Sequence, residues 1–213
     1  MSITVIDYGS GNLRSVAKAL ETAATNIKIS SKIIITSDPK KIKESKKIIL
    51  PGQGSFKDCY QGIKKIPGLE DALNEFVIVK KKPILGICVG MQLFAKVGYE
   101  SEETKGFGWI DAEVRKIDNI NKTLKLPHMG WNQLEVKKNF FLFSNLKNKS
   151  HMYFIHSYEL ITKEKKFVIA TTNYGSSIVV AVAKENIFGT QFHPEKSQKN
   201  GLIVLENFLK WEG

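Results

Sequence analysis

Residues Gly86–Gly90 show the pattern that most directly predicts chemistry, because they place a cysteine between two glycines at the end of an apolar run. The run Pro83–Ile87 is typical of a buried strand, and a helical run begins directly after the turn, at Met91. A nucleophile elbow has this context: a sharp turn exposes the nucleophile, and flanking glycines leave room for it. The next helix favours a thiolate, and the Val89 amide faces a developing oxyanion. We therefore predict that Cys88 is a nucleophile, although lone cysteines more often only pack in a core.

A thiol nucleophile needs a base, and His193 is the best placed of the four histidines. It follows the apolar run Ile187–Phe192, and Pro194 ends that strand. Glu195 lies two positions on, where a carboxylate can orient the imidazole as the third member of a triad. We expect structural or exposed positions for the remaining histidines, His128, His151 and His156.

A glycine-rich turn, Pro51–Gly54, follows another apolar strand, Lys47–Leu50. It lacks the lysine pattern of a phosphate-binding loop, so we expect it to supply a backbone amide donor near Cys88. The turn Gly9–Asn12 lacks the third glycine of a dinucleotide-binding fingerprint. No pair of histidines or cysteines has the spacing of a metal site. The sequence therefore predicts neither a metal nor a cofactor.

The composition argues against several other classes of function. The chain has 213 residues and a net charge of +11, but only Arg14 and Arg115 among its 32 basic residues are arginines. The scattered lysines favour a solvated surface over nucleic-acid recognition, and a docking face for an acidic protein stays open. No apolar run approaches the roughly 18 residues of a membrane span, and we see no leader before the first strand. We expect a cytoplasmic protein that binds neither membranes nor nucleic acid.

The elements that must position these residues alternate in the first half of the chain. Helical spacing begins at Leu13 and recurs over Leu69–Val79, between strand-like runs at Ile3–Asp7, Lys32–Thr36, Lys47–Leu50 and Pro83–Ile87. Apolar strands alternating with helices favour a parallel sheet that is covered on both faces.

The second half has short β-type runs and few helices. The runs are Gly108–Ile117, Thr123–Leu126, Trp131–Val136, Tyr153–Leu160, Phe167–Thr172, Ser177–Ala183 and Ile187–Phe192. They predict antiparallel strands that join or extend the parallel core, followed by a final helix over Lys199–Trp211. We predict one domain over residues 1–213, of α/β class: a mixed, mainly parallel sheet flanked by helices, with additional antiparallel strands in the C-terminal half.

At these residues the sequence resembles the class I, triad-type glutamine amidotransferases, and within them the glutaminase subunits of imidazole glycerol phosphate synthase. The resemblance covers Asp7–Leu13, Leu50–Phe56, Gly86–Gln92, Gly106–Gly108, Pro127–Asn132, Tyr153–Tyr158 and Gln191–Gln198. The elbow and the His-Pro-Glu segment identify the class. Pro127–Asn132 and Tyr153–Tyr158 are similar to the histidine-pathway branch.

The resemblance implies a role for each matching residue. Cys88 attacks the carboxamide of glutamine, His193 transfers protons and Glu195 orients His193, which releases ammonia and then glutamate. The oxyanion donors are Gly52, Gln53 and Val89. The amino-acid end of glutamine is held by Gln92, Ser157 and Tyr158.

The resemblance also implies a heterodimer with a (β/α)8 barrel cyclase subunit. That partner uses the ammonia to make imidazole glycerol phosphate and aminoimidazole carboxamide ribonucleotide in histidine biosynthesis. The implied interface positions are Asn12, Trp131, Asn132, Tyr153 and Lys196. Because free ammonia is protonated and lost at neutral pH, we expect little activity without a loaded partner.

Two alternatives stay open from the sequence. A paralogous glutaminase could supply an amino- or amidino-sugar synthase, and Gln53, where the family often has an aliphatic residue, leaves this open. A non-catalytic regulatory subunit is the other alternative, against which the intact set of Cys88, His193 and Glu195 argues.

Overall fold

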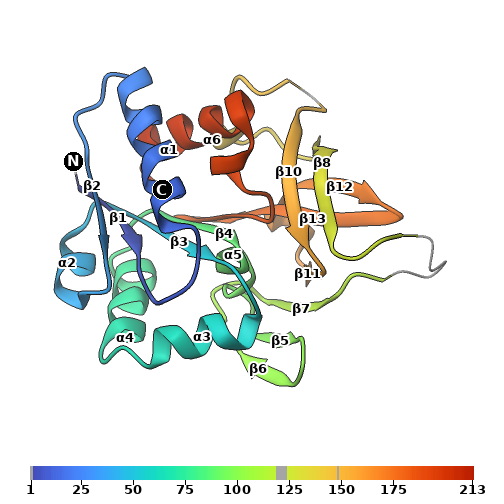
Figure 1. Ribbon diagram of the computed structural model, residues 1–213, viewed down its shortest axis with the longest axis horizontal. Helices are drawn as coiled ribbons and strands as arrows, with labels where there is room; N and C mark the ends of the chain where they lie inside the picture. Colours follow the sequence, from blue (N-terminus) through green and yellow to red (C-terminus); the bar gives the residue numbers. More distant parts are fainter. Residues whose placement is uncertain (1, 119–123, 148) are drawn as a thin grey trace.

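A central eight-stranded sheet runs through the computed structural model, which describes residues 2–118, 124–147 and 149–213 (Figure 1). Five neighbouring strands are parallel: β2 (Lys32–Thr36), β1 (Ser2–Ile6), β3 (Lys47–Gly52), β4 (Ile84–Cys88) and β14 (Ile187–Thr190). The sheet continues antiparallel through β13 (Ser176–Lys184), β12 (Val168–Tyr174) and β9 (Glu135–Val136). The predicted mixed, mainly parallel sheet is confirmed.

Two smaller sheets lie beside this core. One has the order β11 (Tyr158–Thr162), β7 (Ala112–Lys116), β5 (Val97–Tyr99) and β6 (Glu103–Lys105). The other pairs β8 (His128–Gln133) with β10 (His151–His156). The prediction that the later strands join or extend the core is therefore correct for β9, β12 and β13, whereas these others form separate sheets.

Three of the predicted runs need correction. Trp131–Val136 is interrupted at Leu134, so its first part belongs to β8 and its second part to β9, in different sheets. Tyr153–Leu160 is interrupted at Ser157, which allows β10 and β11 to enter different sheets. Residues 124–126 are bends and irregular backbone before β8, so the predicted strand Thr123–Leu126 is wrong there, and Thr123 itself lies outside the described residues. A proline at 127 ends the short apolar run before it can pair.

Helices cover both faces of the sheet, as Figure 1 shows. On one face α1 (Leu13–Asn26) packs against α6 (Gln198–Lys210). On the other lie α2 (Pro39–Glu44), α3 (Phe56–Lys64) and α4 (Leu69–Asn74), the last continuing into a π-helical turn at Glu75–Val79. Single 3-10 turns occur at Phe141–Phe143, Lys165–Phe167 and Pro194–Lys196. The helices that cover the parallel strands explain why those strands read as continuous apolar runs.

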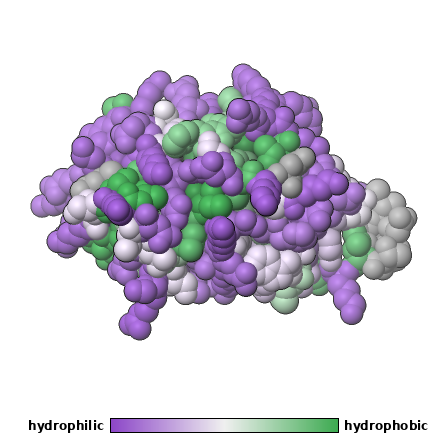
Figure 2. Space-filling view, turned by 90° about the horizontal axis from the view of Figure 1, so that it is seen from above, coloured by the Kyte–Doolittle hydropathy of each residue, from purple (hydrophilic) through white to green (hydrophobic). Residues whose placement is uncertain are grey.

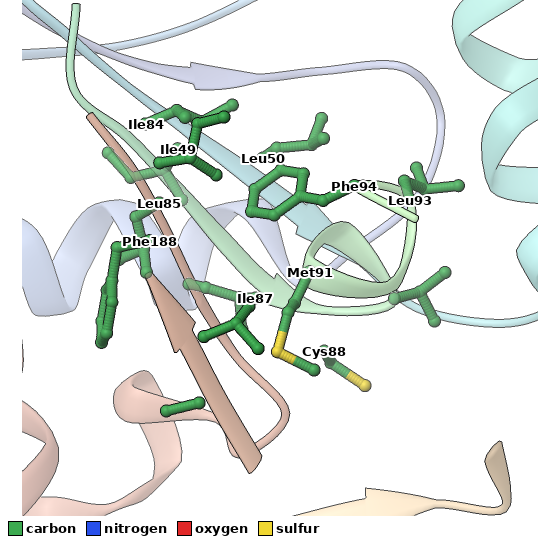
Figure 3. Close-up of a cluster of buried hydrophobic side chains, with 14 of the residues drawn as sticks. Ile49, Leu50, Ile84, Leu85, Ile87, Cys88, Met91, Leu93, Phe94 and Phe188 are labelled. Atoms are coloured by element: carbon green, nitrogen blue, oxygen red, sulfur yellow. The ribbon is translucent and has the colours of Figure 1, made fainter. Parts of the chain in front are cut away.

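The core sits where the parallel strands meet the helices. Side chains of β3 and β4 form a cluster with Phe94 and Phe188, and Figure 3 shows Cys88 at the edge of this cluster. All the isoleucine and leucine side chains of these two strands are 1% exposed or less: Ile48, Ile49, Leu50, Ile84, Leu85 and Ile87. Each such burial stabilises the fold by about 1.5–3 kcal/mol. The strand that ends in Cys88 is thus among the best fixed in the molecule.

The surface agrees with the solvated-lysine interpretation. Figure 2 shows that the face above α1 and α6 is mostly hydrophilic, with smaller apolar areas between the polar side chains. Lysines there form exposed pairs such as Lys18 with Glu21, 3.6 Å apart. Within residues 2–118, 124–147 and 149–213, no helix is both long and apolar enough to cross a membrane.

Candidate active site

Three adjacent parallel strands, β3, β4 and β14, end at one place and bring the predicted site together. In the sheet register Gly52 lies beside Cys88, and Thr190 lies beside Ile87. His193 follows three residues after the end of β14. Open parallel sheets bind ligands at the carboxyl ends of their strands, so this edge is the expected position for chemistry.

Cys88 adopts a strained backbone conformation at the turn between β4 and α5 (Val89–Gln92). Its φ is 55° and its ψ is −114°, a combination that non-glycine residues rarely adopt. The flanking glycines provide space: a Cβ on Gly90 would lie 1.8 Å from the Leu50 carbonyl oxygen, and one on Gly86 would lie 2.5 Å from the Phe94 ring. The turn can therefore form only where both positions are glycine.

His193 and Glu195 form a buried pair. The His193 Nδ1 and the Glu195 Oε1 are 2.8 Å apart, and their side chains are 6% and 2% exposed. The His193 Nε2 is buried without a hydrogen-bond partner among the described residues. Burial alone lowers the pKa of His193, but the nearby Cys88 and the hydrogen-bonded Glu195 carboxylate outweigh it, so the pKa is raised to about 10. This environment favours the imidazolium form of His193.

A cavity of about 370 Å³ opens at the Cys88 sulfur. Of the residues implied by the resemblance it is lined by Gln53, Cys88, Val89, Gln92, Ser157, Tyr158, His193 and Lys196. Gly52 and Glu195 do not line it, since Gly52 packs against Val89 and Gly90 and Glu195 lies behind His193. The sequence analysis missed the further lining residues Gly54, Glu100, Pro127, Ile155 and His156.

One of the implied oxyanion donors is engaged elsewhere. The Gln53 N–H donates to the Ser10 hydroxyl at 3.1 Å, and that hydroxyl donates back to the Gln53 carbonyl at 2.5 Å. The Gln53 amide therefore does not point to an oxyanion in this conformation. The Val89 amide, at the start of α5, directly follows Cys88.

The implied glutamine-binding residues form a linked group. The Gln92 side-chain amide donates to the Tyr158 carbonyl at 3.1 Å and to the Gln191 side-chain oxygen at 3.0 Å. The Tyr158 hydroxyl donates to the Glu100 carbonyl at 3.2 Å, and the Glu100 carboxylate accepts the Phe56 N–H. The Gln92 carbonyl oxygen thus remains as an acceptor, and Glu100 adds a negative charge to the cavity. Glu100 stands in an acidic run with no recognisable spacing, which is why the sequence did not single it out.

Three of the implied interface residues form a cluster on β8, on β10 and on the 3-10 turn Pro194–Lys196 after β14. Trp131, 47% exposed, meets Tyr153 edge to face at 5.9 Å, and the Lys196 ammonium lies 5.9 Å from the Tyr153 ring centroid. Asn132 follows on β8 and donates to the Asn173 carbonyl. Asn12 is exposed at the start of α1, a different element, where its side chain makes no capping bond.

His128 and His156 form a buried hydrogen-bonded pair, as expected for structural histidines. The His128 Nδ1 and the His156 Nε2 are 3.0 Å apart, and the His156 Nδ1 donates to the Tyr158 carbonyl at 2.9 Å. Burial lowers the pKa of each to about 4. Both rings are therefore neutral at pH 7. His151 is exposed, and no group of His, Cys, Asp or Glu in the described part of the chain has the arrangement of a metal site.

Comparison with known proteins agrees with this geometry. Residues 4–211 match the family model described as glutamine amidotransferase class-I. The imidazole glycerol phosphate synthase subunit HisH of Pelagibacter ubique is 55% identical over 98% of this chain and 99% of its own length, and that of Brucella suis biovar 1 is 45% identical over the whole of both chains.

Solved structures show the same fold. A crystal structure of a glutamine amidotransferase superposes on this chain with a TM-score of 0.68 at 20% identity and covers 97% of each chain. A glutamine amidotransferase of Thermotoga maritima superposes with a TM-score of 0.63 at 17% identity and covers 94% of this chain and 80% of the other. The chain belongs to the class I glutamine amidotransferase family, and within it to the group of its full-length HisH relatives.

Proposed function

We propose that this chain hydrolyses glutamine through Cys88, His193 and Glu195 and delivers the ammonia to a synthase subunit of histidine biosynthesis. The observation that carries the proposal is the meeting of a strained elbow cysteine and a buried His–Glu pair at the ends of adjacent strands, in one cavity. The names of the HisH relatives supply the acceptor pathway.

The reaction follows from the positions of these groups. The Cys88 thiolate attacks the carboxamide carbon, and the Val89 amide stabilises the oxyanion. The His193 imidazolium then donates a proton to the leaving nitrogen, which departs as ammonia and leaves a glutamyl thioester. His193, now neutral, takes a proton from water, whose oxygen attacks the thioester. Collapse expels the Cys88 thiolate beside the His193 imidazolium, and the acid that forms loses its proton to solvent and leaves as glutamate. Glu195 holds the ring in orientation throughout.

The cavity offers complementary groups for free glutamine. Its Glu100 carboxylate and the Gln92 carbonyl oxygen suit an α-ammonium group, and Ser157 and Tyr158 line the same wall. At about 370 Å³ the cavity has the size of a small amino-acid site rather than a macromolecular groove. These contacts support glutamine rather than a protein substrate.

The acceptor is a cyclase subunit with a (β/α)8 barrel, which docks on the cluster of Trp131, Tyr153 and Lys196. Lys196 lines the active-site cavity and also lies over the Tyr153 ring, so the cluster adjoins the reaction centre. An exposed tryptophan backed by an aromatic ring is a typical anchor of a protein interface. Met129, 59% exposed on the same strand as Trp131, extends this surface.

Glutamate release by the purified chain tests the proposal, alone and with a histidine-pathway cyclase and its ribonucleotide substrate. We expect strong stimulation by the loaded cyclase and complete loss in Cys88→Ala. If the chain releases glutamate and this cyclase does not stimulate the release, the acceptor of the ammonia is another synthase, such as an amino- or amidino-sugar enzyme. Unchanged activity in Cys88→Ala would contradict the assignment of Cys88 as the nucleophile. If no mixture releases glutamate, the alternative of a non-catalytic regulatory subunit is favoured.

A further inference from the structure

Gln191 is a fully buried polar residue at the reaction centre to which the mechanism above gives no role. It lies between β14 and His193, is 0% exposed, and its backbone N–H donates to the Val180 carbonyl at 2.9 Å. Its side-chain Nε2 lies 3.5 Å from the Cys88 sulfur. Burying a side-chain amide costs free energy unless its N–H and C=O groups form hydrogen bonds. The hydrogen-bond partners of Gln191 therefore indicate its role.

The orientation of the Gln191 amide is fixed by a directional chain of hydrogen bonds. The Tyr158 carbonyl can only accept, so the Gln92 side chain must present its NH2 group to it, at 3.1 Å. The same NH2 group reaches the Gln191 Oε1 at 3.0 Å. The oxygen of Gln191 therefore faces Gln92, and its NH2 group faces the sulfur of Cys88.

We propose that Gln191 is a further catalytic residue: its side-chain amide donates to the Cys88 thiolate and ties the nucleophile to Gln92, the residue that binds glutamine. The assignment rests on the proposed function for the roles of Cys88 and Gln92. A hydrogen bond to the charged form of a group favours that form, and an N–H donor 3.5 Å from sulfur is within bonding distance for this large atom.

The chain has two consequences for the site. In its thiol form Cys88 donates to the Ile155 carbonyl at 3.8 Å, so in that form the sulfur has a second partner besides Gln191 and is not free to turn. Both N–H groups of the Gln92 side chain donate within the protein, so only the side-chain oxygen of Gln92 is available to a substrate ammonium group. Recognition of the amino-acid end and orientation of the nucleophile thus share one rigid network.

The other titratable groups around Cys88 come from three directions. His193, held by Glu195, approaches from the turn after β14, and Tyr8 and Cys59 interact with Cys88 electrostatically from the direction of β1 and α3. His156 lines the cavity at the end of β10 and is neutral above about pH 4. Gln191→Glu leaves all of these groups in place and changes only the group that faces the sulfur.

Gln191→Glu is the sharpest test because it has the same shape. One carboxylate oxygen still accepts from Gln92, whereas the other replaces the donor with a negative charge beside the sulfur. The measurement is the rate of Cys88 alkylation by iodoacetamide against pH, followed by peptide mass spectrometry, with the buried Cys59 as internal reference. We expect the pH of half-maximal reaction to rise by at least about one unit. Gln191→Met, which cannot donate and carries no charge, should move it in the same direction by less.

Gln61→Glu is the matched control, because it makes the same chemical change at an exposed position of α3. It should leave the alkylation profile unchanged. Circular dichroism establishes that each variant is folded, and Gln191→Met decides if Gln191→Glu does not fold. In the wild-type chain, alkylation of Cys88 should also shift the ¹⁵N-labelled side-chain amide resonance of Gln191.

The assignment would be overturned if folded Gln191 variants gave the same pH profile of Cys88 alkylation as the wild-type chain. It would also be overturned if alkylation left the chemical shift of the Gln191 side-chain amide unchanged. With glutamine, Gln191→Glu should lower kcat at pH 7 by about tenfold and change KM less than about threefold, since Gln92 keeps its bond. If Gln191 had only a structural role, its substitution in a folded chain would not shift the alkylation profile and would not lower kcat while KM stays nearly constant. Absence of glutamine turnover in the wild-type chain, both alone and with the loaded cyclase, would refute the proposed function instead, while alkylation would still test Gln191.

Discussion

Replacement of Gly90 by alanine tests the packing that places the nucleophile. A Cβ at this position would lie 1.8 Å from the Leu50 carbonyl oxygen and 2.8 Å from the Leu50 carbonyl carbon. Ordinary contact begins near 3.4 Å, so the β3 backbone or the elbow must shift by about 1.6 Å. Because β3 is hydrogen-bonded to β1 on one side and to β4 on the other, it has no free direction in which to move. We expect a loss of at least about 3 kcal/mol in the free energy of unfolding.

Gly90→Ala should also slow the reaction. A displacement of about 1 Å in a reacting group costs roughly 100-fold in rate, so Gly90→Ala should release glutamate at least about 100-fold more slowly. Urea unfolding and a coupled glutamate assay measure the two effects. Gly68→Ala is the control, because the nearest atom to its Cβ would be 3.8 Å away. Its φ of 75°, a left-handed value that Gly90 does not have, adds about 1 kcal/mol of destabilisation, and we expect unchanged activity. A Gly90→Ala chain with wild-type stability and rate would refute the steric argument.

Three other predictions follow from the same contacts. Glu195→Gln keeps the shape but removes the charge beside His193, so kcat should fall by about 1,000-fold or more in steady-state assays, and a change under tenfold would contradict the proposed triad. Between pH 6.5 and about pH 4, His128 and His156 are protonated in the unfolded chain but neutral in the folded chain. As the pH is lowered through this window, the free energy of unfolding should therefore fall by up to about 3 kcal/mol for each histidine. Urea unfolding that gives the same free energy across the window would contradict this. Trp131→Ala should weaken cyclase binding by about 30-fold in calorimetry without changing turnover in the absence of the partner. Phe141→Ala, equally exposed at 47% but in the 3-10 turn Phe141–Phe143 outside the Trp131 cluster, should change neither.

The chemistry-bearing segments were predictable because their residues are constrained locally. A cysteine between two glycines after an apolar strand has few other interpretations, and the structure gives Cys88 the strained backbone that an elbow requires. The parallel strands were equally clear, since burial on both faces leaves continuous apolar runs. The adjacency of β4 and β14 is not visible in the sequence, because about 100 residues separate strands that pair side by side.

Other features depend on contacts that no local pattern encodes. Gln191 reaches the sulfur only because β14 lies next to β4, and Glu100 reaches the cavity only through its contacts with Phe56 and Tyr158. Whether the Gln53 amide faces the cavity depends on one peptide orientation, which the Ser10 hydroxyl fixes from another loop. The break at Ser157 escaped prediction because the apolar and aromatic pattern continues through it.

The place of β14 in the sheet has a consequence for how the protein matures. Residues 1–118 already contain β1 to β4 and the thiol, but the histidine, the carboxylate and Gln191 arrive on the last strand and the turn after it. Pairing of β14 with β4 is a long-range contact, which tends to form late in folding. A chain still emerging from the ribosome therefore carries a cysteine without its base. The order of synthesis itself delays glutamine consumption until the sheet is complete.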